Sequence, residues 1–203
     1  MLDSVRLGVL VSGSGSNLQA LIERVHGRSA TIAGVCSSND GAFALERARA
    51  AGIESAVFAL AAHGGERDRR DRAMAAWLGE RDVSLVVCAG FMGVLGFEFL
   101  ALFQDRVLNL HPSLLPAFPG SNAIEDAHSA RVAETGVTVH LVDEVLDGGP
   151  VVAQARLPVN YDETPEGLRA RIHAAEHRLL PAVVEDVARG ALDLDVIARK
   201  ART

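Results

Sequence analysis

Short apolar runs alternate with amphipathic segments through the first half of the chain. The continuous apolar runs are typical of strands buried on both faces, and we expect such strands at residues 7–11, 31–36, 55–58 and 85–89. The segments between them predict helices at residues 17–26, 42–51 and 67–80. This alternation of strand and helix favours a parallel sheet with right-handed crossovers and helices on both faces.

The second half of the chain is less regular. Its patterns predict strands at residues 107–110, 137–142 and 151–157, a proline-rich loop at 111–120, and helices at 122–135 and 165–189. The last helix has Thr164 as its expected N-cap and Pro165 at its first position, and Pro181 is expected to interrupt it. Because no repeat or linker divides the chain, we expect one α/β domain over residues 1–203.

The composition is that of a globular protein, with 49% hydrophobic and 23% charged residues. A net charge of −6 disfavours non-specific nucleic-acid binding, which needs a basic face. No apolar run approaches the roughly 20 residues that span a bilayer, and residues 1–6 lead into the first strand without a signal-peptide pattern. We therefore expect a soluble, cytoplasmic protein with neither nucleic-acid nor membrane partners. Cys36 and Cys88 are interpreted as buried apolar residues.

A glycine-rich loop, Ser-Gly-Ser-Gly-Ser-Asn at residues 12–17, connects the first predicted strand to the first helix. Exposed backbone N–H groups and the helix dipole favour an anion at such a position, and glycine lets the backbone approach it. The dinucleotide fingerprint is incomplete, because Leu18 stands where its third glycine would be. The donors of Ser16 and Asn17 suit a monophosphate; a tight turn without a ligand is the alternative.

Polar residues end the strand that begins at residue 107. Asn109 and His111 are two residues apart and therefore lie on the same side of that strand, at the carboxyl end where such sheets bind ligands. They could serve as a hydrogen-bond donor and an acid/base group. Asp147, in the turn Asp-Gly-Gly-Pro, could orient or charge His111. A histidine satisfied within the core and an ordinary reverse turn are the alternatives.

Residues 173–177, His-Ala-Ala-Glu-His, match a metallopeptidase pattern in which two histidines share one helix face. The pattern needs a third protein ligand, and the sequence offers none nearby. We therefore expect no metal site.

Several segments form a specific combination: residues 11–20, 89–92, 109–116, 136–140 and 147–151, and the pair Glu176-His177 followed by Pro181. The block Asn-Leu-His-Pro-Ser-Leu-Leu-Pro and the distant Asp-Gly-Gly-Pro are its most distinctive parts. In this combination the chain resembles the glycinamide ribonucleotide formyltransferases, the folate-dependent family of purine synthesis.

The resemblance implies a single formyltransferase domain, with a Rossmann-like phosphate-binding half (1–100) and a folate-binding and catalytic half (101–203). The implied activity moves a formyl group from the co-substrate 10-formyltetrahydrofolate to the amine of glycinamide ribonucleotide, without a metal, in a monomer or homodimer. The amine would attack the formyl carbon directly, while a charged His111 and the Asn109 amide stabilise the formyl oxygen.

The resemblance also assigns residues to these ligands. The implied catalytic set is Asn109, His111 and Asp147. Gly15, Ser16 and Asn17 would hold the substrate phosphate, and Glu176 with His173 the ribose. The folate would contact Arg67, Met92, Val94, Leu95, Asn109, Asp143 and Asp147. The chain departs from the family at Gly93, where a basic residue is usual, and at residues 121–123, where some members have a histidine-containing stretch.

Three alternatives are weighed against this interpretation. Formyltetrahydrofolate hydrolases use water in place of the amine and carry an additional N-terminal regulatory domain. Methionyl-tRNA formyltransferases carry an additional C-terminal domain and a basic surface. A catalytically idle nucleotide-binding module would need the glycine loop but not Asn109, His111 and Asp147, all of which are present.

Overall fold

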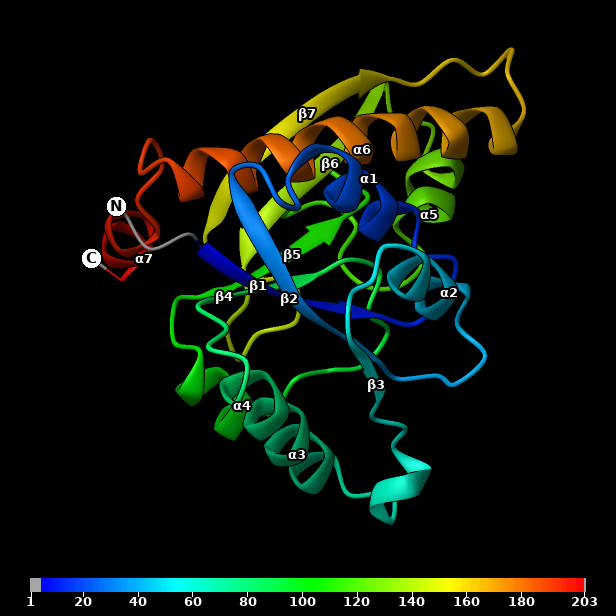
Figure 1. The fold of residues 1–203 in the computed structure, drawn as a ribbon. Helices are drawn as coiled ribbons and strands as arrows, with labels where there is room; N and C mark the ends of the chain where they lie inside the picture. The colour runs from blue at the N-terminus through cyan, green and yellow to red at the C-terminus, as the bar shows by residue number, and fades with distance from the viewer. Residues whose placement is uncertain (1–4, 203) are drawn as a thin grey trace.

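A seven-stranded sheet between two layers of helices forms the protein (Figure 1). The computed structural model describes residues 5–202; the expected lead into the first strand at residues 1–4 therefore lies outside the described residues. The strands are β1 (Val5–Val11), β2 (Ala30–Ser37), β3 (Ser55–Val57), β4 (Leu85–Cys88), β5 (Val107–His111), β6 (Glu134–Leu141) and β7 (Val151–Pro158).

The helices follow the strands in the order that the first-half pattern indicates. They are α1 (Ser16–Arg24), α2 (Phe43–Ala50), the short 3-10 helix η1 (Ala61–His63), α3 (Arg67–Gly79), α4 (Phe97–Leu102), α5 (Ala123–Ser129), α6 (Pro165–Ala188) and α7 (Leu194–Ala201). Thr164 caps α6 as expected, because its hydroxyl accepts the N–H of Gly167 at 3.2 Å.

Alternating residues of the central strand fill two separate cores. Leu7, Val9 and Val11 of β1 are fully buried in a cluster that includes residues of α1, α2, α6 and α7. Leu10 points to the opposite face, into a cluster with residues of α3 and α4. Figure 1 shows α3 and α4 together on one side of the sheet and α1 and α6 on the other. This arrangement confirms an α/β fold with helices on both faces.

The strand order β3-β2-β1-β4-β5-β6-β7 places a switch point between β1 and β4. β2 and β4 lie on opposite sides of β1, so the loops that leave β1 and β4 diverge at the carboxyl edge, where such folds bind ligands. The pairs β3–β2, β2–β1, β1–β4 and β4–β5 are parallel, whereas the pairs β5–β6 and β6–β7 are antiparallel. The antiparallel register places Asn109 opposite His140, and His111 opposite Thr138.

One predicted helix end and one predicted helix break are wrong. The helix expected at residues 122–135 ends at Ser129, because Arg131 adopts a positive φ of 52° and the chain then enters β6 at Glu134. The expected break at Pro181 is absent from α6, whose 24 residues are continuous. Proline cannot donate to the carbonyl of His177, and Arg24 Nη1 approaches that oxygen at 3.4 Å instead. The pattern also missed η1, α4 and α7.

Candidate active site

Two loops at the carboxyl edge are joined by a single serine. Ser12, directly after β1, accepts the backbone N–H of Met92 on its hydroxyl oxygen at 2.8 Å. The same oxygen lies 2.6 Å from the hydroxyl of Ser38, at the end of β2. The glycine loop and the segment after β4 therefore form one continuous surface at the switch point. Sequence analysis placed Ser12 in the loop but missed this connection.

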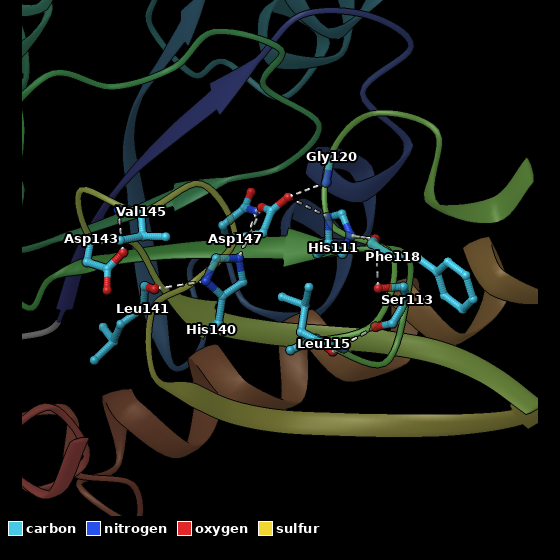
Figure 2. A network of polar contacts seen from close by, with 12 residues as sticks. His111, Ser113, Leu115, Phe118, Gly120, His140, Leu141, Asp143, Val145 and Asp147 are labelled. Carbon is cyan, nitrogen blue, oxygen red and sulfur yellow. Dashed lines mark hydrogen bonds and ion pairs between the residues drawn. The ribbon is translucent and has the colours of Figure 1, made fainter. Parts of the chain in front are cut away.

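Next to this surface, β5, β6 and the loop between β6 and β7 bring four polar side chains together. In Figure 2, Asp147 lies between His111 and His140. Its Oδ2 is 3.5 Å from Nδ1 of His111, and its Oδ1 is 3.6 Å from Nε2 of His140 and 3.4 Å from Nδ2 of Asn109. The structure therefore brings the expected set Asn109, His111 and Asp147 together and adds His140 to it.

His111 is buried, and both of its ring nitrogens face oxygen acceptors. Nε2 lies 2.8 Å from the carbonyl oxygen of Phe118, and Nδ1 faces the carboxylate of Asp147. Only the doubly protonated ring has a hydrogen to donate to each of them. The Gly120 N–H also donates to Asp147 Oδ2, at 2.8 Å, and so ties the proline-rich loop to the same carboxylate.

Asp147 is held as a carboxylate by its neighbours. The hydrogen bond to His140, the Gly120 N–H and the charges of His111 and His140 keep the pKa of Asp147 below its ordinary value, although burial opposes them. Asp147 itself has a positive φ of 52°. A Cβ on Gly149 would lie 1.9 Å from the carbonyl oxygen of Leu141, so the turn that positions Asp147 requires glycine there.

His140 fixes the orientation of Asn109. Its Nδ1 lies 2.8 Å from the carbonyl oxygen of Leu141, and its Nε2 lies 3.0 Å from Nδ2 of Asn109 and 3.6 Å from Oδ1 of Asp147. The amide nitrogen of Asn109 is thus engaged by His140 and Asp147. Sequence analysis placed His140 on a strand without giving it a role, because the antiparallel pairing of β5 and β6 is what opposes it to Asn109.

A second polar cluster joins the start of α1 to α6. Asn17 is buried and donates through Nδ2 to Oε2 of Glu176 at 3.0 Å, and His173 Nδ1 lies 2.9 Å from the same oxygen. This hydrogen bond raises the pKa of His173. Oδ1 of Asn17 is buried without a hydrogen-bond partner among the described residues. The structure thus brings the residues expected at the phosphate and those expected at the ribose into direct contact.

The glycine loop opens α1 as expected, and Gly15 also packs against α2. Gly15 has a φ of +70°, and a Cβ there would lie 2.6 Å from Cβ of Ala44 in α2. Gly15 therefore allows α2 to pack closely against the loop. A cavity of about 280 Å³ lies beside the loop. Its lining is rich in polar and basic side chains: Ser16, Gln19, Ala20, Glu23, Arg24, Arg47 and His177.

The residues expected at the folate differ in exposure. Met92 and Val94 are 71% and 53% exposed, so their apolar side chains are accessible to a ligand. Leu95 is instead buried in the core cluster with α3 and α4, so its side chain supports the segment rather than lining its surface.

The remaining expected folate residues lie on two other elements. Asp143 accepts the N–H of Val145 at 2.9 Å and so shapes the loop before Asp147. Arg67 is exposed at the start of α3, and a Cβ on Gly96 would lie 3.7 Å from its Nε. Arg67 therefore lies beside the segment that carries Met92 and Val94.

Within residues 5–202, no group of three or more His, Cys, Asp or Glu side chains could hold a metal ion. Across the same residues, no helix has the length and apolar character to span a bilayer.

Comparisons with known proteins agree on one family. The family model described as formyl transferase matches residues 5–184. The phosphoribosylglycinamide formyltransferase of Escherichia coli (strain K12) is 38% identical over 188 residues, which cover 92% of this chain and 88% of the relative. The chicken trifunctional purine biosynthetic protein adenosine-3 is 39% identical over 194 residues, but this chain spans only 19% of its length.

A solved structure gives the same result. The crystal structure of glycinamide ribonucleotide transformylase 1 from Symbiobacterium toebii superposes with a TM-score of 0.88 at 42% identity, covering 94% of this chain and 90% of the other. These matches extend over nearly the whole chain, and the residues matched by the family model include both polar clusters. This chain belongs to the formyl transferase family, among the phosphoribosylglycinamide formyltransferases.

Proposed function

We propose that this protein transfers a formyl group from 10-formyltetrahydrofolate to the amine of glycinamide ribonucleotide, in de novo purine biosynthesis. The observation that supports it most directly is the polar cluster of Asn109, His111, His140 and Asp147, whose two histidines are buried, beside an exposed apolar segment. A polar cluster of this kind suits charge that develops on a formyl oxygen, and an apolar surface suits a pterin ring.

In this proposal the two substrates meet at the switch point. The phosphate of glycinamide ribonucleotide binds at Gly15, Ser16 and Asn17, and Glu176 with His173 binds the ribose. The folate lies on Met92 and Val94, beside Arg67 and the loop from Asp143 to Asp147. Holding both molecules in one site replaces a bimolecular encounter and lowers the entropic part of the barrier.

The amine then attacks the formyl carbon and negative charge develops on the formyl oxygen. A protonated His111, stabilised by the ionised Asp147, donates to that oxygen together with the amide of Asn109. Both ring nitrogens of His111 face protein oxygens in this structure, and the amide nitrogen of Asn109 contacts His140 and Asp147. The formyl oxygen must therefore replace or share one contact of each residue. The tetrahedral intermediate then collapses: the bond between the formyl carbon and N10 of the folate breaks, the proton lost by the attacking amine is transferred to N10, and tetrahydrofolate leaves. No covalent enzyme intermediate is needed.

One assay tests the proposal against its alternative. The protein is incubated with 10-formyltetrahydrofolate, with and without glycinamide ribonucleotide, and release of the deformylated folate is followed. We expect release only when glycinamide ribonucleotide is present. Equal release without it would instead indicate a formyltetrahydrofolate hydrolase, and no release in either case would contradict both functions. We further propose a cytoplasmic protein that acts as a monomer or homodimer.

A further inference from the structure

Two adjacent charged residues of α3 are buried, and the proposed mechanism uses neither. Arg70 is 4% exposed and Asp71 is completely buried. Arginine and aspartate are almost never buried without partners, because the loss of hydration must be compensated by ion pairs and hydrogen bonds. Their partners therefore indicate what the pair does.

Both residues bind the segment at residues 91–96, which follows β4. Asp71 accepts from Nε of Arg70 at 2.7 Å on one oxygen and from the N–H of Gly96 at 2.6 Å on the other. Arg70 donates through Nη2 to the carbonyl oxygen of Val94 at 2.8 Å, and its guanidinium lies 5.6 Å from the ring centre of Phe91. The pair thus contacts the segment at its beginning, middle and end.

Gly93 leaves the space that Arg70 occupies. A Cβ on Gly93 would lie 2.8 Å from Nη1 of Arg70 and 2.7 Å from a ring carbon of Phe91. A side chain at position 93 therefore cannot coexist with the guanidinium in its present place unless one of them moves. Gly96 is similarly close to the helix, since a Cβ there would lie 3.1 Å from carboxylate oxygens of Asp68 and Asp71.

We propose that Arg70 and Asp71 are positioning residues for the folate, which hold residues 91–96 so that Met92 and Val94 face the ligand. In this chain the cation beside that segment comes from α3, and Gly93 provides the room for it. This inference rests on the proposed function, because it assigns Met92 and Val94 to the folate. Neither Arg70 nor Asp71 needs to touch the ligand, as the contacts to backbone atoms of Val94 and Gly96 act through the segment.

The test separates folate binding from the rest of catalysis. Arg70→Met removes the hydrogen bonds but keeps a long side chain, Arg70→Lys keeps the charge, and Arg69→Met is the exposed neighbour used as control. We expect Arg70→Met to raise the KM for 10-formyltetrahydrofolate roughly tenfold, as small misplacements of binding groups do, and to leave the KM for glycinamide ribonucleotide unchanged. Arg70→Lys should fall between parent and Arg70→Met, and Arg69→Met should equal the parent.

A double variant that moves the cation from position 70 to position 93 tests the role of Gly93. Gly93→Arg alone should raise the folate KM, because the new side chain meets the guanidinium of Arg70. Combining it with Arg70→Ala should restore most of the affinity, because the cation then comes from position 93. If Arg70→Met does not fold, Gly93→Ala and the double variant carry the test.

An unchanged folate KM in folded Arg70→Met or in Gly93→Ala would overturn the inference. An equal rise in the KM values for both substrates would also overturn it, and so would a double variant Gly93→Arg with Arg70→Ala whose folate KM is no better than that of Gly93→Arg alone.

Titration calorimetry with tetrahydrofolate distinguishes the positioning proposal from the proposed reaction. A parent that binds tetrahydrofolate but transfers no formyl group contradicts only the proposed reaction, and the same variants then test positioning by their tetrahydrofolate affinity. A parent that binds no tetrahydrofolate overturns both.

Discussion

At the scale of single residues, Asp147 connects the separate parts of the polar cluster. Its two oxygens face Asn109, His111 and His140 and accept the Gly120 N–H, so one carboxylate links β5, β6 and the proline-rich loop. A group with this many partners in a buried site acts as part of a unit, and its removal affects all of them.

The first prediction concerns the coupling of His111 and Asp147. Asp147→Asn removes the charge that faces Nδ1 of His111, and we expect kcat to fall about 10²- to 10³-fold with little change in either KM, because the interaction strengthens as charge develops on the formyl oxygen. The double variant with His111→Ala should be little slower than the slower single variant. Steady-state kinetics of the three variants measure this; losses that multiply would show that the residues act independently.

The second prediction follows from the lowered pKa of Asp147. A carboxylate whose folded-state pKa lies below its ordinary value of 3.8 contributes stability that is complete above about pH 5 and is lost as the pH falls through the folded-state pKa. Asp147→Asn should therefore be less stable than the parent at pH 7, and the difference should shrink as the solution is made more acidic. Urea unfolding between pH 2 and 7 measures both.

Asp143→Asn is the matched control for this titration, since Asp143 is an exposed carboxylate of the same loop. A difference between Asp147→Asn and parent that stays constant down to pH 2 would contradict the assignment.

At the scale of elements, the glycine loop shows how two helices depend on one residue. The N–H of Ala44 in α2 donates to the carbonyl oxygen of Gly13 at 3.0 Å, and Gly15 is in contact with the same alanine. Arg47 of α2 adds a hydrogen bond from Nε to the carbonyl oxygen of Ser14 at 2.9 Å. The loop is therefore held from the α2 side, and its other side is left for the proposed phosphate.

The third prediction compares the two glycines of this loop. Gly15→Ala places a Cβ against Ala44 in a left-handed conformation, and we expect it to lower the free energy of unfolding by about 1–3 kcal/mol. Gly13→Ala is the control: a Cβ there meets nothing within 4 Å, so stability should change by no more than about 0.5 kcal/mol. Urea unfolding curves measure both. Equal stability of the two variants would show that α2 does not require glycine at position 15.

At the scale of the whole molecule, the candidate site and α7 lie at opposite ends of the strands. The carboxyl ends of β1, β4 and β5 carry the candidate site. α7 lies at the opposite edge, where Asp195 pairs with Arg106 just before β5, at 2.8 Å. Leu194 of this helix is buried in the core cluster with α1 and α6. Changes in α7 should therefore affect stability rather than chemistry.

The fourth prediction tests this separation. Leu194→Ala removes a buried side chain far from the candidate site, and we expect the free energy of unfolding to fall by about 2–4 kcal/mol while kcat and both KM values of the folded protein stay unchanged. Val196→Ala, in the same helix but 37% exposed, should lose much less. Thermal unfolding and steady-state kinetics measure the two effects, and a loss of kcat in Leu194→Ala would contradict it.

Periodicity and turn chemistry determined most of the fold from the sequence, because both act over a few neighbouring residues. The strands and helices of the first half were predicted in order, and Thr164 was identified as the cap of α6. The same local signals extended the helix expected at 122–135 too far: they predicted the strand at 137–142 but not its start at Glu134. The positive φ of Arg131 ends the helical run, and the pairing of β6 with β7 begins the strand earlier than the pattern indicates.

The sequence by itself also determined which chemical groups stand at the strand ends, and the motifs around Asn109, His111 and Asp147 pointed to the family. Only the tertiary structure decided which groups meet. His140 joins Asn109 through the antiparallel register of two strands, and Arg70 reaches a carbonyl 24 residues further along the chain. Both contacts depend on the order and direction of strands in the sheet. These are set by packing between distant segments, and no pattern along a single segment encodes them.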